Sequence, residues 1–414
     1  MKKCFIIAIA MLTNLITNAQ RPPFDDYIGD GTEYNPYRIY TKEHLMELGD
    51  SIKNYPVYPA NNWTKGKYFI LMTDITDSLD TPIGIATDNV TFKHYPFQGN
   101  FDGNNNKITL AIYDKGISSS IFYGLFSMIS KAKIINLTVD GYIKNNLNTL
   151  YSLGVGAIVG LARDSCEIYN CTSYVDITVE RSCLGGIIGR ADYPSIIVAN
   201  CINYGNIEST GGYTNYGNCG GIVGFVGGNG LNWLIEIINC SNYGKITGNT
   251  YIGGIVGFNS NCPLLITNSI NCGFIKGING YWVSNYVGGI FGGNDATISN
   301  CINTGKVTGA DHIGGITGFY YTYTSNVPTI SNCLNIADVE GSNNIGGILG
   351  YGKYFTKGSI LINNSTNSGF VKGKDNVGGI VGYTNNIDSI TIENCVNTGV
   401  IEGNSNTNGI IGDD

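Results

Sequence analysis

The side chains that could carry out acid-base catalysis are few in this sequence, and they lie far apart. A glycoside hydrolase needs two carboxyl groups that face each other across the bond to be cleaved. The acidic residues in the second half of the chain are isolated instead, and most lie near Gly, Asn or Thr, where Asp commonly forms turns. They include Asp295, Asp311, Asp338, Glu340, Asp375 and Asp388. This spacing predicts no catalytic carboxylate pair.

The three histidines complete no catalytic motif. His44 begins the segment His44-Leu-Met-Glu47, which differs from the His-Glu-x-x-His arrangement of zinc peptidases. His312 follows Asp311 in a short polar segment, where we expect a solvated turn. From these residue types we expect a protein that is not an enzyme, with no catalytic residue.

The sequence gives equally little support for a metal site or a phosphate-binding site. Asp74, Asp77 and Asp80 could attract Ca²⁺ through their carboxylates, but the Asp-x-Asp-x-Asp-Gly loop is absent and a polar loop is the simpler interpretation. Cys-x-x-Cys spacing, which is typical of zinc sites, is also absent. The glycine-rich segment 227–230 is not followed by the Lys of a phosphate-binding loop. We therefore expect no metal and no cofactor.

Aromatic residues offer non-covalent chemistry, because Tyr and Trp combine an apolar face with a polar tip and suit sugar rings or protein partners. Most of them gather in two unusually long segments, which run from Gly205 to Gly220 and from Gly273 to Gly288, 15 positions each. The corresponding segment from Gly244 to Gly253 spans only 9 positions. The candidate ligand-binding residues are Tyr213, Tyr216, Tyr251, Tyr281, Trp282 and Tyr286. The alternative is that these side chains only shield a corner of the fold.

These aromatic segments belong to a repeat, which must position them. The pattern Gly-Gly-Ile-x-Gly occurs seven times, beginning at Gly185, Gly220, Gly253, Gly288, Gly314, Gly346 and Gly378. Between the copies, an Asn that precedes Cys or Ser recurs at positions 170, 200, 239, 268, 300, 332, 364 and 394, in steps of 29 to 39 residues. Self-similarity at such a period is typical of solenoid proteins.

Each repeat contains three short β-prone pieces and no amphipathic helix. In the last full unit these pieces are Val377–Tyr383, Ser389–Val396 and Gly399–Glu402. Three strands and three corners close one triangular coil, and coils stacked about 4.8 Å apart bury the apolar side chains that one coil cannot bury alone. We therefore predict an all-β fold: a right-handed parallel β-helix of about ten three-strand coils, with an N-terminal cap that contains a short helix.

Two columns of residues follow from stacking such coils. The isoleucines of the Gly-Gly-Ile-x-Gly copies should form one buried ladder, and the neighbouring glycines indicate either close backbone packing or positive φ. The cysteines of the Asn-Cys pattern recur at one position, where Ser269 and Ser365 replace them. They are Cys171, Cys201, Cys240, Cys301, Cys333 and Cys395. Exchange with Ser indicates free, buried thiols, because stacked neighbours have unfavourable Cβ directions for a disulfide.

The domain organisation follows from the ends of the repeat. Residues 1–19, with Lys2 and Lys3 before a short apolar stretch, resemble a signal peptide, so we expect export to the cell surface or the medium. Residues 20–115 should form the N-terminal capping region, in which Thr41 begins a helix over Lys42–Ile52. Residues 116–414 carry the repeats, and we expect no transmembrane segment in the mature chain.

Composition limits the partners. The chain has 414 residues, of which 13% are charged, and a net charge of −7 at pH 7. Nucleic acids bind proteins largely through clustered Lys and Arg, so we expect no nucleic-acid partner.

The Gly-Gly-Ile-Val-Gly series, best at Gly220, Gly253 and Gly378, resembles the GLUG-repeat family of secreted, adhesin-like bacterial β-helix proteins. The ordered N-terminal run from Gly29-Asp-Gly-Thr32 to Phe97-Gln-Gly-Asn-Phe-Asp-Gly103 is similar to the segment that often precedes such repeats. The resemblance covers nearly all of the mature chain, and Ala19-Gln20 is typical of signal peptides in Bacteroidota.

The resemblance implies a secreted or cell-surface, non-catalytic recognition protein that binds a glycan or a surface protein of a host or neighbouring cell. Parallel β-helices also include hydrolases and lyases, so an extracellular polysaccharide-active enzyme is the alternative. A purely structural spacer is a third possibility.

Overall fold

The computed structural model describes residues 28–53, 61–86, 94–114, 122–145, 154–180, 182–192, 194–210, 217–228, 234–260, 262–278, 285–322, 327–354, 359–385 and 389–412. The segment expected to be a signal peptide, residues 1–19, lies outside these ranges.

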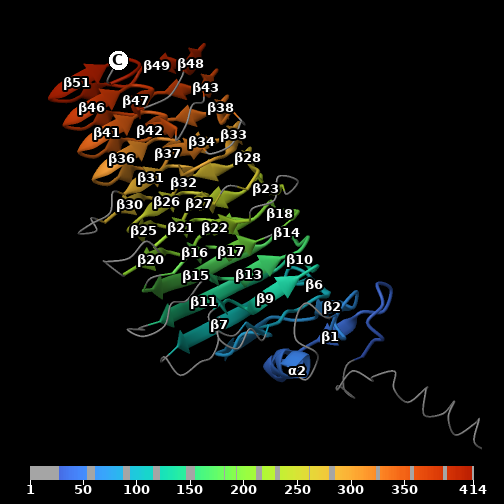
Figure 1. Cartoon of the computed structure of the whole chain (residues 1–414). Helices are drawn as coiled ribbons and strands as arrows, with labels where there is room; N and C mark the ends of the chain where they lie inside the picture. Colours follow the sequence, from blue (N-terminus) through green and yellow to red (C-terminus); the bar gives the residue numbers. More distant parts are fainter. Residues whose placement is uncertain are drawn as a thin grey trace, which may run out of the picture.

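The described chain winds into a right-handed parallel β-solenoid of about ten turns, which confirms the predicted fold. Three of its sheets have 12, 10 and 9 strands, and each strand pairs in parallel with its counterpart on the next turn. A fourth sheet contains β7 (Lys107–Asp114), β11 (Thr138–Asn145), β15 (Thr172–Val179) and the short strand pairs that follow them. Figure 1 shows the turns stacked from the N-terminal helix to the C-terminal strands.

One turn near the C-terminal end shows the path of the chain. It contains β46 (Asp375–Gly378) in the 10-stranded sheet, β47 (Val381–Asn385) in the 9-stranded sheet, β48 (Ser389–Glu393) in the 12-stranded sheet, and β49 (Val396–Asn397) and β50 (Ile401–Glu402) in the fourth sheet. The first expected piece, Val377–Tyr383, is thus divided into two strands by a bend at Gly379 and Ile380. Each Gly-Gly-Ile segment therefore joins two sheets.

The isoleucine ladder is confirmed. Its members are all fully buried: Ile187, Ile222, Ile255, Ile290, Ile316, Ile348 and Ile380. The backbones of successive members are also hydrogen-bonded, as where the Ile255 N–H donates to the Ile290 carbonyl oxygen at 2.9 Å. Burying one such side chain stabilises the fold by about 1.5–3 kcal/mol, so the ladder is a major source of stability.

Close packing explains the paired glycines beside this ladder. Gly253 and Gly254 are not among the residues with positive φ. A Cβ added to Gly254 would lie 2.0 Å from the Gly289 carbonyl oxygen and 2.4 Å from the Asn271 Cγ. Backbones of successive turns approach each other where any side chain would collide, so glycine is required there for space.

Asparagines form two further ladders. Those of the Asn-Cys and Asn-Ser pattern have left-handed backbones, with φ of 54° at Asn170 and 52° at Asn394, a conformation that Asn tolerates well. A second row lies inside the solenoid, where the Asn242 Nδ2 donates to the Asn271 Oδ1 at 2.8 Å and to the Gly244 carbonyl oxygen at 2.9 Å. The second row supplies the hydrogen bonds that buried amides need.

The cysteine column consists of free thiols, as expected. Cys171, Cys201, Cys240, Cys301 and Cys333 are buried, and Cys395 is partly exposed. Ser fits the same column because its hydroxyl accepts a backbone hydrogen bond, as where the Cys240 N–H donates to the Ser269 Oγ at 3.1 Å. Burial raises the pKa of the Cys201 and Cys240 thiols well above the ordinary value, so both thiols are protonated.

The N-terminal helix is also confirmed. α2 (Lys42–Lys53) begins after Thr41, whose Oγ1 accepts a hydrogen bond from the His44 N–H at 3.3 Å. Its residues Leu45, Leu48 and Ile52 are fully buried. No helix in the described ranges combines the length and the apolarity that crossing a membrane would require.

The 12-stranded sheet begins within residues 20–115, the expected capping region. β1 (Tyr37–Ile39), β2 (Tyr68–Leu71) and β6 (Asn100–Asp102) pair in parallel, one after the other, and β6 pairs with β10 (Lys133–Ile135). The 12-stranded sheet thus runs without a break from the expected capping region into the repeats.

Candidate ligand-binding groove

Two rows of side chains run along the solenoid on either side of the Gly-Gly-Ile bend. The first row lies in the 10-stranded sheet and uses β26 (Tyr251–Gly253), β31 (Tyr286–Gly288) and β36 (Asp311–Gly314). Parallel pairing in register places Tyr251, Tyr286 and His312 at equivalent positions on consecutive turns. Asn344 and Asn376 continue the row towards the C-terminal end.

The second row lies in the 9-stranded sheet. Its strands are β27 (Val256–Ser260), β32 (Phe291–Gly293), β37 (Thr317–Thr322), β42 (Leu349–Tyr354) and β47. The register aligns Phe258, Gly293, Phe319, Tyr351 and Tyr383 in this order. In each turn, a strand of the first row, such as β26, leads through the Gly-Gly-Ile bend into a strand of the second row, such as β27. The two rows therefore lie on either side of the bend.

The rings of the two rows stack into one continuous cluster. Along the first row, ring centroids are 4.7 Å apart for Tyr251 and Tyr286, with 14° between the ring planes, and 5.0 Å apart for Tyr286 and His312, with 11°. His312 then lies 4.6 Å from the ring of Tyr351 in the second row. Tyr286 also packs against Phe319, at 4.4 Å between centroids.

Glycines in the repeat make room for these rings. A Cβ on Gly257 would lie 2.5 Å from the Gly224 carbonyl oxygen, so glycine lets the backbones of neighbouring turns pack closely next to Phe258. A Cβ on Gly293 would lie 2.9 Å from the Phe319 Cβ and 3.1 Å from the Tyr251 Cδ1. Gly293 therefore allows these two aromatic side chains to close over it.

The stacked rings border a shallow cavity of about 440 Å³, which we call the aromatic groove. It is lined by Tyr251, Phe258, Ser260, Tyr286, Asn294, Phe319, Tyr321, Tyr351 and Lys353. Most of the rings are partly exposed, whereas Lys353 is exposed and Phe319 is buried. The groove thus offers aromatic surface, hydroxyl groups and one cation to a ligand.

The stack itself is uncharged. Burial lowers the pKa of His312 to about 4, so the imidazole is neutral at pH 7. The Asn344 Nδ2 can only donate to the His312 Nδ1, which lies 2.9 Å away, and this places the imidazole proton on Nε2. Burial likewise raises the pKa of the Tyr286 phenol, which stays protonated.

The expectation of a solvated turn at His312 was wrong. Its backbone is left-handed, with φ of 57°, as expected for a corner. The side chain, however, is sandwiched between the rings of Tyr286 and Tyr351 on neighbouring turns. Only the stacking of turns brings those rings to the imidazole.

Of the six residues predicted to bind a ligand, the structure brings Tyr251 and Tyr286 together. Tyr213, Tyr216, Tyr281 and Trp282 lie outside the described residues. The prediction missed Phe258, Phe319 and Tyr351, whose signal was an aromatic residue directly after the last glycine of a Gly-Gly-Ile-x-Gly copy.

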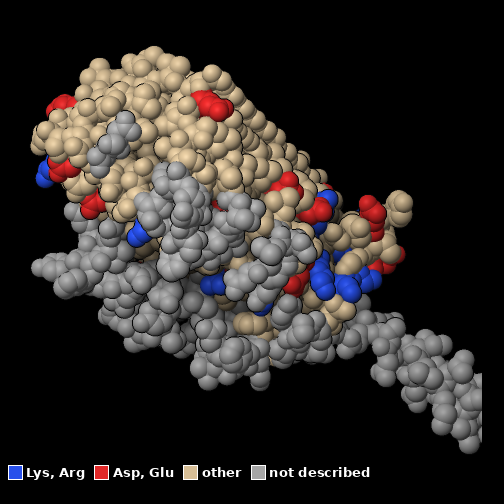
Figure 2. All heavy atoms as spheres, turned by 45° about the horizontal axis from the view of Figure 1, so that its top comes forward, with Lys and Arg blue, Asp and Glu red and all other residues tan. Residues whose placement is uncertain are grey.

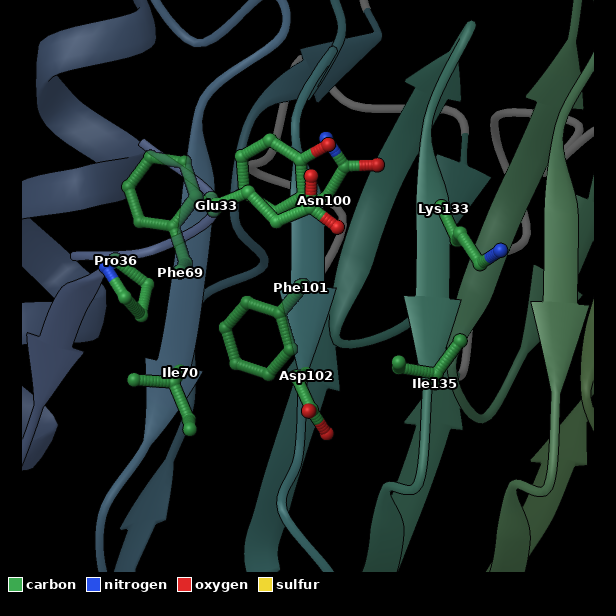
Figure 3. Close-up of a pocket in the computed structure, with 10 residues that line it drawn as sticks. Glu33, Pro36, Phe69, Ile70, Asn100, Phe101, Asp102, Lys133 and Ile135 are labelled. Atoms are coloured by element: carbon green, nitrogen blue, oxygen red, sulfur yellow. The ribbon is translucent and has the colours of Figure 1, made fainter. Parts of the chain in front are cut away.

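A second cavity, of about 360 Å³, lies on the 12-stranded sheet near the N-terminal end. Figure 3 shows Asn100 and Asp102 on one strand and Lys133 and Ile135 on another. Two of its charged groups have partners: Lys133 forms a 2.9 Å ion pair with Glu167, and the Asp102 carboxylate accepts a hydrogen bond from the Asn136 amide at 3.1 Å. This cavity is therefore a weaker candidate for a ligand-binding site than the aromatic groove.

Charge is sparse over much of the solenoid. Figure 2 shows a face on which Lys, Arg, Asp and Glu are few over most of the described surface and gather near the N-terminal end. Uncharged residues therefore make up most of the described surface in this view.

No family model matches this chain, and no curated protein matches it. Two solved structures are similar in fold. One, described as IgA1 Protease, has a TM-score of 0.47 and 18% identity over 74% of this chain, which spans only 22% of that protein. The other is a candidate immunoglobulin A1 protease from Bacteroides ovatus, with a TM-score of 0.40 and 16% identity over 90% of this chain and 86% of that protein.

These neighbours correct one expectation. The sequence predicted a protein that is not an enzyme, whereas both neighbours are described as proteases, so that expectation is withdrawn. The chemical reason is that dispersed carboxylates argue only against glycoside hydrolysis, while peptidases also use hydroxyl and thiol nucleophiles. At this level of identity the likeness concerns the fold alone.

Proposed function

We propose that this chain is an exported recognition protein that binds an extended glycan along the aromatic groove. The observation that carries the proposal is the partly exposed stack of Tyr251, Tyr286, His312 and Tyr351, which spans four consecutive turns. The rings stack face to face, so their exposed edges can contact the apolar parts of sugar rings, while phenol hydroxyls and Ser260 can bind sugar hydroxyls.

The repetition of the groove favours a polymeric ligand. Equivalent groove positions recur at each turn, with 4.7 Å between the Tyr251 and Tyr286 ring centroids and 5.0 Å between those of Tyr286 and His312. A polysaccharide with a short chemical repeat can make the same contact on successive turns, whereas an irregular protein surface cannot. The uncharged stack favours a neutral glycan over a strongly anionic one.

Export and surface location belong to the same proposal. They are supported by the basic and apolar residues at the N-terminus and by the resemblance to adhesin-like GLUG-repeat proteins. The glycan partner would then belong to a host or to a neighbouring cell.

Affinity electrophoresis of the intact chain in gels that contain single neutral polysaccharides tests the proposal. We expect at least one polysaccharide to retard the chain, and the double variant Tyr251→Ala, Tyr286→Ala to migrate freely in the same gel. Tyr142→Ala is the matched control, because Tyr142 is an exposed tyrosine on the fourth sheet, outside the groove. Equal retardation of the double variant and the parent chain would reject the groove as the binding site.

The same polysaccharides also distinguish binding from catalysis. Incubation with the parent chain, followed by an assay for new reducing ends, reports cleavage of the bound polymer. New ends that the double variant does not produce would make the groove an active site as well as a binding site.

A further inference from the structure

A second tyrosine stack lies on the fourth sheet, apart from the aromatic groove. Parallel pairing in register places Tyr174, Tyr204 and Tyr243 on three consecutive turns. The ring centroids of Tyr174 and Tyr204 are 4.8 Å apart, and their planes differ by 6°. Those of Tyr204 and Tyr243 are 4.9 Å apart, with 13° between the planes.

These three side chains are accessible as well as ordered. Their exposed fractions are 51% for Tyr174, 40% for Tyr204 and 48% for Tyr243. Their backbones are tied to the preceding turn, since the Tyr204 N–H donates to the Ser173 carbonyl oxygen at 2.7 Å and the Tyr243 N–H to the Asn203 carbonyl oxygen at 2.8 Å. Neighbouring phenols are thus held side by side while an oxidant in solvent can reach them.

We propose that Tyr174, Tyr204 and Tyr243 form an oxidative cross-linking site, at which hydrogen peroxide and a peroxidase join neighbouring rings as dityrosine. Each ring of a pair loses one electron and one proton and becomes a phenoxyl radical. The two radicals couple through their ortho carbons and one C–C bond forms. The two ring C–H bonds at these carbons break, and their protons move to the phenol oxygens as the rings regain aromaticity. One peroxide molecule accepts the two electrons and two protons and is reduced to two waters.

The groove tyrosines provide an internal comparison. Tyr251 and Tyr286 are stacked as closely, at 4.7 Å, but they are only partly exposed, because further rings pack against them. Tyr286 is packed against both His312 and Phe319, and Tyr251 against Phe258. Because the three tyrosines of the fourth sheet are more open to solvent, cross-linking starts there. The product is a covalent link between neighbouring turns in addition to the polypeptide backbone.

The test uses the intact chain with peroxidase and hydrogen peroxide in the Cys272→Ser background. Cys272 is an exposed thiol whose backbone N–H donates to the Asn242 carbonyl oxygen, so it lies one turn from Tyr243 and would reduce tyrosyl radicals. We expect dityrosine fluorescence, a mass loss of two hydrogens per link, and cross-linked peptides that join Tyr174 to Tyr204 or Tyr204 to Tyr243.

Tyr204 belongs to both pairs, so Tyr204→Phe should reduce the dityrosine signal within one chain to that of the untreated protein. Phe keeps the ring and the packing, and thermal unfolding of the variant should match that of its parent. Tyr142→Phe, which changes an exposed tyrosine outside the stack, should leave the signal unchanged. An undiminished signal in Tyr204→Phe, or cross-links that map to Tyr251 and Tyr286, would overturn the proposal.

Discussion

The ring of Tyr286 lies over the imidazole of His312, with 5.0 Å between the ring centroids and 11° between the planes. The two residues are separated by a full turn of the solenoid and meet because β31 and β36 pair in register. Tyr286 lines the aromatic groove, and the lowered pKa of His312 makes the stability of the fold depend on pH. Ligand binding and stability can both be measured.

Removing one ring from the stack should weaken ligand binding. Tyr286→Ala removes a ring that contacts Tyr251, His312 and Phe319. Loss of one aromatic contact is worth about 0.5–1.5 kcal/mol, so we expect binding of a retained polysaccharide to weaken by about two- to twelvefold. Isothermal titration calorimetry measures the change, with Tyr142→Ala as the control. Unchanged affinity would place the sugar elsewhere.

Stability should depend on pH through His312. Burial lowers the folded-state pKa of His312 to about 4 from its ordinary value of 6.5. Between these values the unfolded chain binds a proton that the folded chain does not, so the contribution is fully present above pH 6.5 and declines as pH falls towards 4. The full effect is at most about 3 kcal/mol.

Urea unfolding at pH 7.5 and pH 4.5 measures this loss, and His312→Asn is the matched variant. Asn344 and Asn376 occupy the same row with left-handed φ of 59° and 55°, so Asn fits the backbone. We expect the variant to lose less free energy of unfolding than the parent between the two pH values. An identical loss in both chains would show that other groups account for the pH dependence.

Glycine should be indispensable at the bend and dispensable at the last turn. A Cβ on Gly254 would lie 2.0 Å from the Gly289 carbonyl oxygen, whereas a Cβ on Gly409, at the same motif position of the last turn, would meet nothing within 4 Å. We expect Gly254→Ala to cost more than about 3 kcal/mol or to prevent folding, and Gly409→Ala to change stability by less than about 0.5 kcal/mol. Thermal and urea unfolding compare the two, and similar costs would contradict the packing explanation.

The more exposed cysteine thiols should react with an alkylating reagent before the buried ones. Of the eleven cysteines in the described ranges, all of them free, Cys272 is exposed, Cys395 is intermediate and the others are buried. Because burial protects a thiol and raises its pKa, brief alkylation of the native chain without reductant should label Cys272 first, and alkylation in denaturant should label all eleven of these thiols. Intact-mass spectrometry counts the labels. Fewer labels in denaturant would show that disulfides exist.

The sequence alone determined the local and periodic features. The repeat of Gly-Gly-Ile-x-Gly predicted the coils and the buried isoleucine ladder, because each copy has the same environment and one face of the chain must be apolar in every turn. The helix after Thr41 followed from its cap and its apolar spacing. Exchange of Cys with Ser in one column predicted free thiols.

The tertiary structure decided where the side chains of different turns meet. Nothing in the sequence near His312 indicates that Tyr286 and Tyr351 enclose it, because these contacts depend on strand register and on the bend that brings two sheets together. The repeat likewise left open whether glycine served positive φ or close approach, and the backbone geometry at Gly254 decided for close approach. A periodic sequence specifies which positions are equivalent, whereas the distance between rows depends on how the closed turn folds in space.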